Sequence, residues 1–162
     1  MAAKRIMQEI KEHNKNINYH YSISVTEDIF KWNFIIVGPE ETLYENGLFS
    51  GSIDFPSSYP NKPPNVRFNS NIFHPNIYTN GQVCISILHE GSDQYGYETV
   101  SERWSPSQSV NTIMLSIISL LSEPNLESPA NLNASKMFKE DYEKYKKTIY
   151  KTVALSQDNY HY

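Results

Sequence analysis

The chain has 162 residues, of which 39% are hydrophobic, 13% aromatic and 20% charged. That is enough for one globular domain with a real core, and it argues against disorder. A net charge of −4 argues against a general nucleic-acid-binding protein, and a single cysteine excludes an internal disulfide or a metal site built on a cysteine pair.

The charge is uneven along the chain. Basic residues gather near the N-terminus and acidic residues in the middle, an asymmetry that suits protein partners with charged faces. The start, MAAKRIMQEI, lacks the apolar core of a signal peptide, and the longest apolar stretch, TIMLSIISLL, is about half a membrane span. We therefore expect a reducing, cytoplasmic location without direct membrane insertion, and any membrane association to come from a partner.

The first predicted element is an amphipathic helix over AAKRIMQEIKEH, with an apolar stripe of Ala3, Ile6, Met7 and Ile10. Four strand-like runs rich in Ile, Val, Phe and Tyr follow, separated by turn signals. They cover Tyr19–Val25, Phe30–Val37, Leu48–Phe55 and Asn65–Phe68. Short connections between consecutive strands favour an antiparallel meander over βαβ units.

The second half of the chain predicts helices. In WSPSQ, Ser105 can cap a helix, Pro106 suits its first position and Gln108 can complete a capping box. An apolar stripe for packing on the sheet follows: Val110, Ile113, Met114, Ile117, Leu120 and Leu121. Glu123-Pro124 ends this helix, and a further helix is predicted over Ser135–Tyr150. The whole pattern is that of one α+β domain, residues 1–162, with a four-stranded meander, an N-terminal helix and C-terminal helices.

The long irregular segment from Asn69 to Arg103 holds Cys84, the only cysteine. Loops of this length are usually functional or disordered. A lone cysteine is usually a buried, inert hydrophobe, but Cys84 lies in a loop-rich region near polar residues. A Cys-His protease is the first chemistry to consider, yet His74 precedes Pro75 and is better explained as a structural hydrogen bonder.

Several motifs resemble the ubiquitin-conjugating enzyme family. HPN followed by a cysteine eight residues after its asparagine, then a WSP-started helix ending in EPN, is similar to the family's central motif. KWNFIIVGPEETLYENGLF resembles the family's second strand, turn and third strand, and FPSSYPNKPPNVRF resembles its Phe-Pro-x-x-Tyr-Pro-x-x-Pro-Pro stretch. The resemblance spans nearly the whole chain and implies the ubiquitin-conjugating fold.

The resemblance implies a thioester relay without a cofactor or a metal. A ubiquitin-activating enzyme would pass ubiquitin to Cys84, and a RING-type ligase would direct attack by a lysine amine. Thiol-to-thioester exchange requires access to the sulfur more than an extreme pKa. Asn76 matches the position to which the family assigns stabilisation of the developing oxyanion, although an asparagine that only organises a turn is an equal alternative.

Two departures from the family pattern are informative. Many relatives carry aspartates where this chain has Ser86 and Ser128. The insertion HEGSDQYGYETVSERW resembles the acidic loop of the subfamily that serves endoplasmic-reticulum-associated degradation and builds lysine-48-linked ubiquitin chains. We therefore expect His89, with Glu90 or Asp93, to assist deprotonation of the incoming lysine; the alternative is a solvated loop.

The resemblance also implies a face for the activating enzyme and RING-type ligases. Its positions here are Lys4 and Arg5, Asn61 and Lys62, and Ser105 and Pro106. Basic residues suit steering toward an acidic partner, although plain surface charges are commoner. Asn61 replaces a frequently apolar side chain, which leaves the choice of ligase open.

Three alternatives remain beside an active, monomeric ubiquitin-conjugating enzyme. The chain could conjugate another ubiquitin-like modifier, act as a non-catalytic scaffold of the same fold, or be an unrelated thiol hydrolase. The scaffold is disfavoured because Cys84 and HPN are both present. The hydrolase would need a Cys-His pair that no sequence motif supports.

Overall fold

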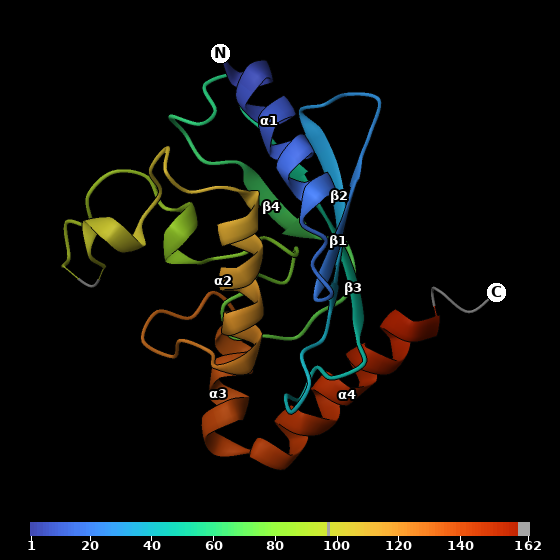
Figure 1. Ribbon diagram of the computed structural model, residues 1–162. Helices are drawn as coiled ribbons and strands as arrows, with labels where there is room; N and C mark the ends of the chain where they lie inside the picture. The colour runs from blue at the N-terminus through green and yellow to red at the C-terminus, as the bar shows by residue number, and fades with distance from the viewer. Residues whose placement is uncertain (97, 159–162) are drawn as a thin grey trace.

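The computed structural model describes residues 1–96 and 98–158, and it confirms an α+β architecture with a four-stranded antiparallel meander in the order β1-β2-β3-β4. The strands are β1 Tyr21–Val25, β2 Lys31–Val37, β3 Leu48–Asp54 and β4 Asn65–Phe68. The helices are α1 Ala2–Lys15, α2 Val110–Ser122, α3 Leu132–Glu140 and α4 Tyr142–Asp158, with short 3-10 turns at Ser86–Leu88 and Val100–Glu102. In Figure 1, α1 lies at one end of the molecule and α3 and α4 lie at the other.

The sheet follows the period-two pattern of its sequence. In β2 the side chains of Trp32, Phe34 and Ile36 are buried and their neighbours are more exposed. Phe34 pairs with Gly51 of β3, where a Cβ would lie 2.3 Å from the Phe34 ring, so this cross-strand pair accommodates only a glycine. Three predicted strand ends were one or two residues too long.

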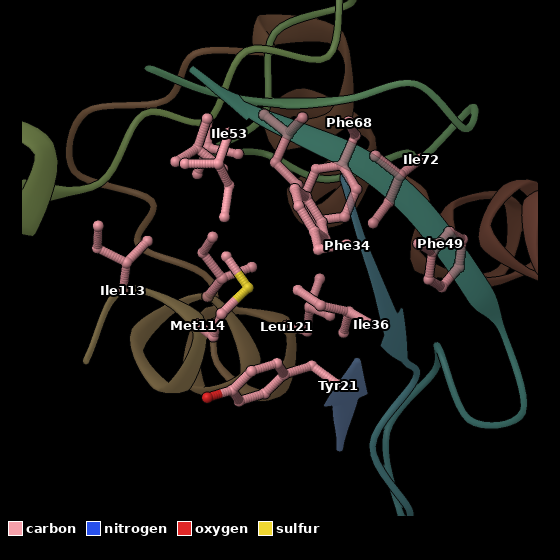
Figure 2. Packing of buried hydrophobic residues seen from close by; sticks show 14 of the residues in the cluster. Tyr21, Phe34, Ile36, Phe49, Ile53, Phe68, Ile72, Ile113, Met114 and Leu121 are labelled. Atoms are coloured by element: carbon pink, nitrogen blue, oxygen red, sulfur yellow. The ribbon is translucent and has the colours of Figure 1, made fainter. Parts of the chain in front are cut away.

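The core lies between the sheet and α2. Figure 2 shows Ile113, Met114 and Leu121 of α2 facing Phe34 and other apolar side chains of the sheet. The predicted α2 stripe is confirmed at five positions, and Leu120 is only partly buried. The apolar face of α2 therefore packs against the sheet and forms one core with it.

The predicted start of α2 was wrong. The helix begins at Val110, and Ser109 caps it, accepting from the Thr112 N–H in a capping box. Residues 105–108 form a turn instead, in which the Gln108 N–H donates to the Ser105 carbonyl at 2.9 Å. Arg5 of α1 donates to the carbonyl oxygens of Pro106 and Gln108, at 2.8 and 2.5 Å, and Glu9 of α1 accepts from the Val110 N–H. Contacts remote in sequence therefore accompany the later helix start.

The predicted stripe of α1 was also shifted. Ile6 is buried and Ile10 partly buried, but Ala3 and Met7 are exposed. The inward face instead contains Glu9, which is 6% exposed. A carboxylate on the buried face cannot be predicted from an apolar stripe, because its burial depends on partners from other segments.

The predicted helix over Ser135–Tyr150 is two helices. α3 ends at Glu140, and Asp141 has a non-helical backbone (φ −148°, ψ 74°) and accepts from the Lys144 N–H, which caps α4. Among the described residues, no helix combines the length and the apolar character needed to cross a membrane. Tyr97 of the Gly-Tyr-Glu motif and residues 159–162 of the predicted domain lie outside the described residues.

Candidate active site

His74 is the first residue of a turn in which the Ile77 N–H donates to the His74 carbonyl. Its Nδ1 accepts from the Asn76 N–H at 2.9 Å, and Nε2 donates to the Leu120 carbonyl at 2.8 Å. These two bonds define one neutral tautomer, since the carbonyl can only accept. Burial lowers the pKa of His74 to about 4, although the bond to Leu120 opposes the shift. His74 is therefore the structural hydrogen bonder expected from its position before Pro75.

Asn76 joins two segments far apart in sequence. Its Nδ2 donates to the Asn125 carbonyl at 2.7 Å, and its Oδ1 accepts from the Asn125 N–H at 2.9 Å. Its backbone carbonyl accepts from the Cys84 N–H at 2.9 Å. The side chain is 2% exposed and lies in the wall of the same cleft as Cys84. Asn76 thus ties the cysteine segment to the chain that follows α2.

Cys84 is half-buried and lies just after an isolated antiparallel bridge between Ile77 and Val83. It lines two clefts, one of about 160 Å³ and one of about 230 Å³. The smaller cleft also contains Ser86 and Ser128, the two positions where related chains carry acids. Burial raises the pKa of the Cys84 thiol, a contact from the Tyr78 hydroxyl lowers it in part, and the charge of Glu98 raises it further. The resting sulfur at neutral pH is therefore a thiol, and the clefts give it access.

His89 faces the sulfur. The 3-10 turn Ser86–Leu88 reverses the chain after Cys84, and the His89 N–H donates to the Ser86 carbonyl at 2.9 Å. The turn places His89 Nε2 at 3.9 Å from Cys84 Sγ. The Trp104 N–H donates to the His89 carbonyl at 2.9 Å, which closes the base of the inserted loop. The structure thus contains a Cys-His pair that no sequence motif indicated.

The carboxylate that reaches His89 belongs to Glu98, a residue that the sequence analysis did not select. His89 Nδ1 lies 2.7 Å from Glu98 Oε1, and Arg103 Nη1 donates to Glu98 Oε2 at 2.5 Å. Glu98 lies nine positions after His89, so neither helical nor strand spacing would pair them. The sequence signal available was only the acidic composition of the loop.

Glu90 and Asp93, the partners expected for His89, have other contacts. Glu90 is exposed, and its backbone carbonyl accepts from Arg103 Nη2 at 2.7 Å. The Asp93 carboxylate accepts from the Tyr95 N–H at 2.9 Å and from the Glu98 N–H at 2.8 Å. Asp93 thus shapes the loop around Glu98. These bonds join the described residues of the segment from 89 to 103, which in Figure 1 projects to one side of α2.

The chain is similar to known proteins over most of its length. The family model described as ubiquitin-conjugating enzyme matches residues 5–153. The chain belongs to the ubiquitin-conjugating enzyme family. Ubiquitin-conjugating enzyme E2 15 of Schizosaccharomyces pombe is 47% identical over 154 residues, which are 93% of this chain and 92% of that protein. Ubiquitin-conjugating enzyme E2 G2 of Homo sapiens is 47% identical over 160 residues, 96% of each chain. Probable ubiquitin-conjugating enzyme E2 7 of Caenorhabditis elegans is 52% identical over 132 residues, 81% of this chain and 80% of that protein. The resemblance inferred from the motifs, including the subfamily, is confirmed.

In this ubiquitin-conjugating enzyme, hydrogen bonds join the three segments expected to form one partner face. Arg5 of α1 binds the carbonyls of residues 106 and 108, as described above. The Trp104 indole donates to the Pro60 carbonyl at 2.8 Å, and the Tyr59 hydroxyl donates to Glu9 of α1. The face is therefore assembled from α1, the loop at 60–62 and the turn at 105–108.

The side chains expected on that face differ in availability. Lys4, Asn61, Lys62 and Pro106 are exposed. Ser105 is partly buried, and its Oγ lies 2.7 Å from Ser107 Oγ. The Arg5 guanidinium is used within the chain. In residues 1–96 and 98–158, no group of three or more His, Cys, Asp or Glu side chains could hold a metal ion.

Proposed function

We propose that this ubiquitin-conjugating enzyme accepts ubiquitin as a thioester on Cys84 and passes it to a lysine amine. The observation that carries the proposal is the sulfur itself: it is half-buried, lines two clefts and has an imidazole nitrogen at 3.9 Å. In the first step the thioester of the activating enzyme exchanges with the Cys84 thiol, which releases the activating enzyme's own thiol. In the second step a C–N bond forms and the C–S bond breaks, and the lysine ammonium loses two protons, one to the departing sulfur and one finally to solvent.

Each step calls for a proton acceptor. The pKa of Cys84 is raised, and an unperturbed lysine has a pKa of about 10.4, so both nucleophiles arrive protonated near pH 7. We assign this role to His89, the base that faces the sulfur. In this proposal Asp93 contributes to proton transfer only indirectly, because it accepts from the backbone N–H of Glu98 and so shapes the loop around that residue.

We assign two functions to Asn76. Its bonds to Asn125 support the loop-organising role directly. Nδ2 carries a second hydrogen beyond the one donated to Asn125, and we propose that this hydrogen stabilises the oxyanion that forms on the thioester carbonyl. The two functions are separable, because one affects folding and the other affects only the transfer step.

We further propose that the face built from α1, residues 60–62 and residues 105–108 binds the activating enzyme and a RING-type ligase in turn. Exposed Lys4 and Lys62 supply positive charge for an acidic partner. The acidic insertion and the similarity to relatives named E2 G2 support lysine-48-linked chains and a role in endoplasmic-reticulum-associated degradation. In this proposal residues 1–162 act as a single, monomeric catalytic domain in the cytoplasm, recruited to membranes by a partner.

The test is whether the activating enzyme can load the chain with ubiquitin. The chain is incubated with activating enzyme, ATP and either ubiquitin or another ubiquitin-like modifier, and the products are separated on a non-reducing gel. We expect an adduct with ubiquitin that a thiol reductant removes, and a reductant-resistant ester with Cys84→Ser. An adduct only with another modifier would assign the chain to that modifier, and no adduct with any modifier would contradict the proposal. Linkage is then read from the chains formed on lysine-substituted ubiquitin.

A further inference from the structure

The carboxylate of Glu98 lies between an imidazole and a guanidinium. Its Oε1 and Oε2 are 2.7 and 3.0 Å from His89 Nδ1, and its Oε2 accepts from Arg103 Nη1 at 2.5 Å. The side chains of Glu98 and Arg103 are 19% and 12% exposed, so the pair is largely withdrawn from water. A charged group in this setting holds its partners in defined positions.

This contact determines which nitrogen of His89 carries the proton. A carboxylate can only accept hydrogen bonds, so the His89 nitrogen beside Glu98 must be the donor. In the neutral ring, Nδ1 is then protonated, and Nε2 presents its lone pair. Nε2 is the atom 3.9 Å from Cys84 Sγ. The opposite tautomer would place a lone pair against the Glu98 carboxylate and a proton toward the sulfur.

Glu98 is itself fixed from two sides. Arg103 Nε donates to the Gly91 carbonyl and Nη2 donates to the Glu90 carbonyl, each at 2.7 Å. The Glu98 N–H donates to the Asp93 carboxylate at 2.8 Å. The loop therefore holds both the backbone and the carboxylate of Glu98 in place. Glu102 lines the same cleft, but its carboxylate accepts from the Thr99 N–H and completes a local cap.

We propose that Glu98 is a positioning residue, which holds His89 in the Nδ1-protonated tautomer with Nε2 directed at the bond that breaks. This inference rests on the proposed function. The lysine arrives as an ammonium ion, and as its nitrogen attacks, one proton passes to His89 Nε2 while Glu98 stabilises the imidazolium that forms. The C–N bond forms, the C–S bond breaks, and a second proton of the attacking nitrogen passes to the departing Cys84 sulfur. The imidazolium releases its proton to solvent, so the thiol and the neutral imidazole are restored and the net step releases one proton.

The first experiment observes the tautomer and does not depend on activity. The full chain is labelled with ¹⁵N-histidine, and the two ring nitrogens of His89 are assigned by NMR above pH 8, where an ordinary histidine is neutral. We expect a protonated Nδ1 in the parent and loss of this preference in Glu98→Ala. A parent with the proton on Nε2, or a preference unchanged in Glu98→Ala, would overturn the proposal.

The second experiment measures transfer in a single turnover. Each chain is loaded with ubiquitin, the activating enzyme is quenched, and discharge to free lysine is followed. Because His89 also serves the loading step, Glu98→Gln is incubated until it is loaded to the same extent as the parent. We then expect it to discharge on the order of tenfold to a hundredfold more slowly, since the base is present but misdirected. Glu27→Gln removes the same charge from an exposed side chain outside the site and should remain within about twofold of the parent.

The pH profile separates a proton-transfer role from a merely structural one. The titratable or charged groups facing His89 are Cys84, Glu98, Arg103 and Glu102. The lysine amine loses its proton near pH 10, where a base contributes less. We expect the difference in discharge rate between Glu98→Gln and the parent to become smaller as the pH rises from 7 toward about 10. A deficit that is constant across this range, or absent throughout, would overturn the proposal. Failure of the parent to load would instead contradict the proposed function, and the NMR result would still decide the tautomer.

Discussion

Glu9 of α1 accepts a hydrogen bond of 2.8 Å from the backbone N–H of Val110, the residue at which α2 begins. The same carboxylate pairs with Arg5 Nε at 3.0 Å and accepts from the Tyr59 hydroxyl. Burial and the bond to Glu9 raise the pKa of Tyr59. One buried carboxylate thus satisfies donors from the helix start, the 59–62 loop and its own helix.

Removing that carboxylate should destabilise the fold. Glu9→Ala leaves two buried donors and the Arg5 guanidinium without their acceptor, and we expect a loss of about 3 kcal/mol in the free energy of unfolding. Urea denaturation monitored by tryptophan fluorescence measures it. Glu12→Ala changes an exposed carboxylate on the same helix and should stay within about 0.5 kcal/mol. Equal effects of the two substitutions would contradict the role of Glu9.

Substitutions of Lys4 and Arg5 should distinguish electrostatic attraction of a partner from hydrogen bonding within the chain. The exposed Lys4→Ala should slow association with the activating enzyme, more so at low salt, with unfolding unchanged within about 0.5 kcal/mol. Arg5→Ala should instead cost about 1–3 kcal/mol of stability, because the carbonyls of residues 106 and 108 lose their donor. Stopped-flow association and denaturation curves give the two quantities. If Arg5→Ala leaves stability unchanged, the internal role of Arg5 is wrong.

His74 should make stability depend on pH. Its folded pKa is about 4, below the unfolded value near 6.5, so the folded chain resists protonation. The stability that follows from the neutral ring is fully present above pH 6.5 and is lost as the pH falls toward 4, a change on the order of 3 kcal/mol. Urea midpoints at pH 7.5, 6 and 5 measure the decline.

The control for this pH-dependent loss of stability is to replace His74 with a residue that does not titrate. His74→Gln should flatten the slope between pH 6.5 and 5, where few carboxylates titrate, at the cost of a lower baseline. His20→Gln changes an exposed histidine and should keep the parent slope. A parental slope in His74→Gln would assign the pH dependence to other groups.

Asn76→Ala tests whether one amide has two functions. Loss of the bonds to Asn125 should lower stability by about 1–3 kcal/mol. If the remaining N–H also stabilises the oxyanion, discharge of loaded ubiquitin should slow by about 10²-fold, measured well below the melting temperature. Asn125→Ala keeps the backbone groups that Asn76 binds and serves as the comparison. Normal discharge from a destabilised Asn76→Ala chain would leave only the loop-organising function.

Asn61 should weaken binding to those RING-type ligases whose groove accepts an apolar side chain at this position. Asn61→Leu adds apolar surface at an exposed position, and its burial should strengthen binding of a RING domain by about 1–2 kcal/mol. Calorimetric titration measures the change. Ser57→Leu adds the same surface at another exposed position of the 55–64 loop. If both substitutions act alike, the effect is non-specific.

The sequence alone determined α1, the four-stranded meander and α2 in their order, and the central motif around Cys84. These features depend on interactions between near neighbours: the alternation of buried residues along β2, the spacing of apolar residues along α2 and the fixed geometry of His74-Pro75. The family motifs were readable for the same reason, since each is a contiguous stretch.

Only the tertiary structure decided which polar groups meet. Glu9 and Val110 are 101 residues apart, Asn76 and Asn125 are 49 apart, and the loop between His89 and Glu98 has no regular period. The start of α2 differs from the prediction in the same way, since the Val110 N–H at the helix start donates to the remote Glu9 carboxylate. A buried polar side chain is placed by the partners that the whole fold brings within about 3 Å, and residue order does not encode that distance locally.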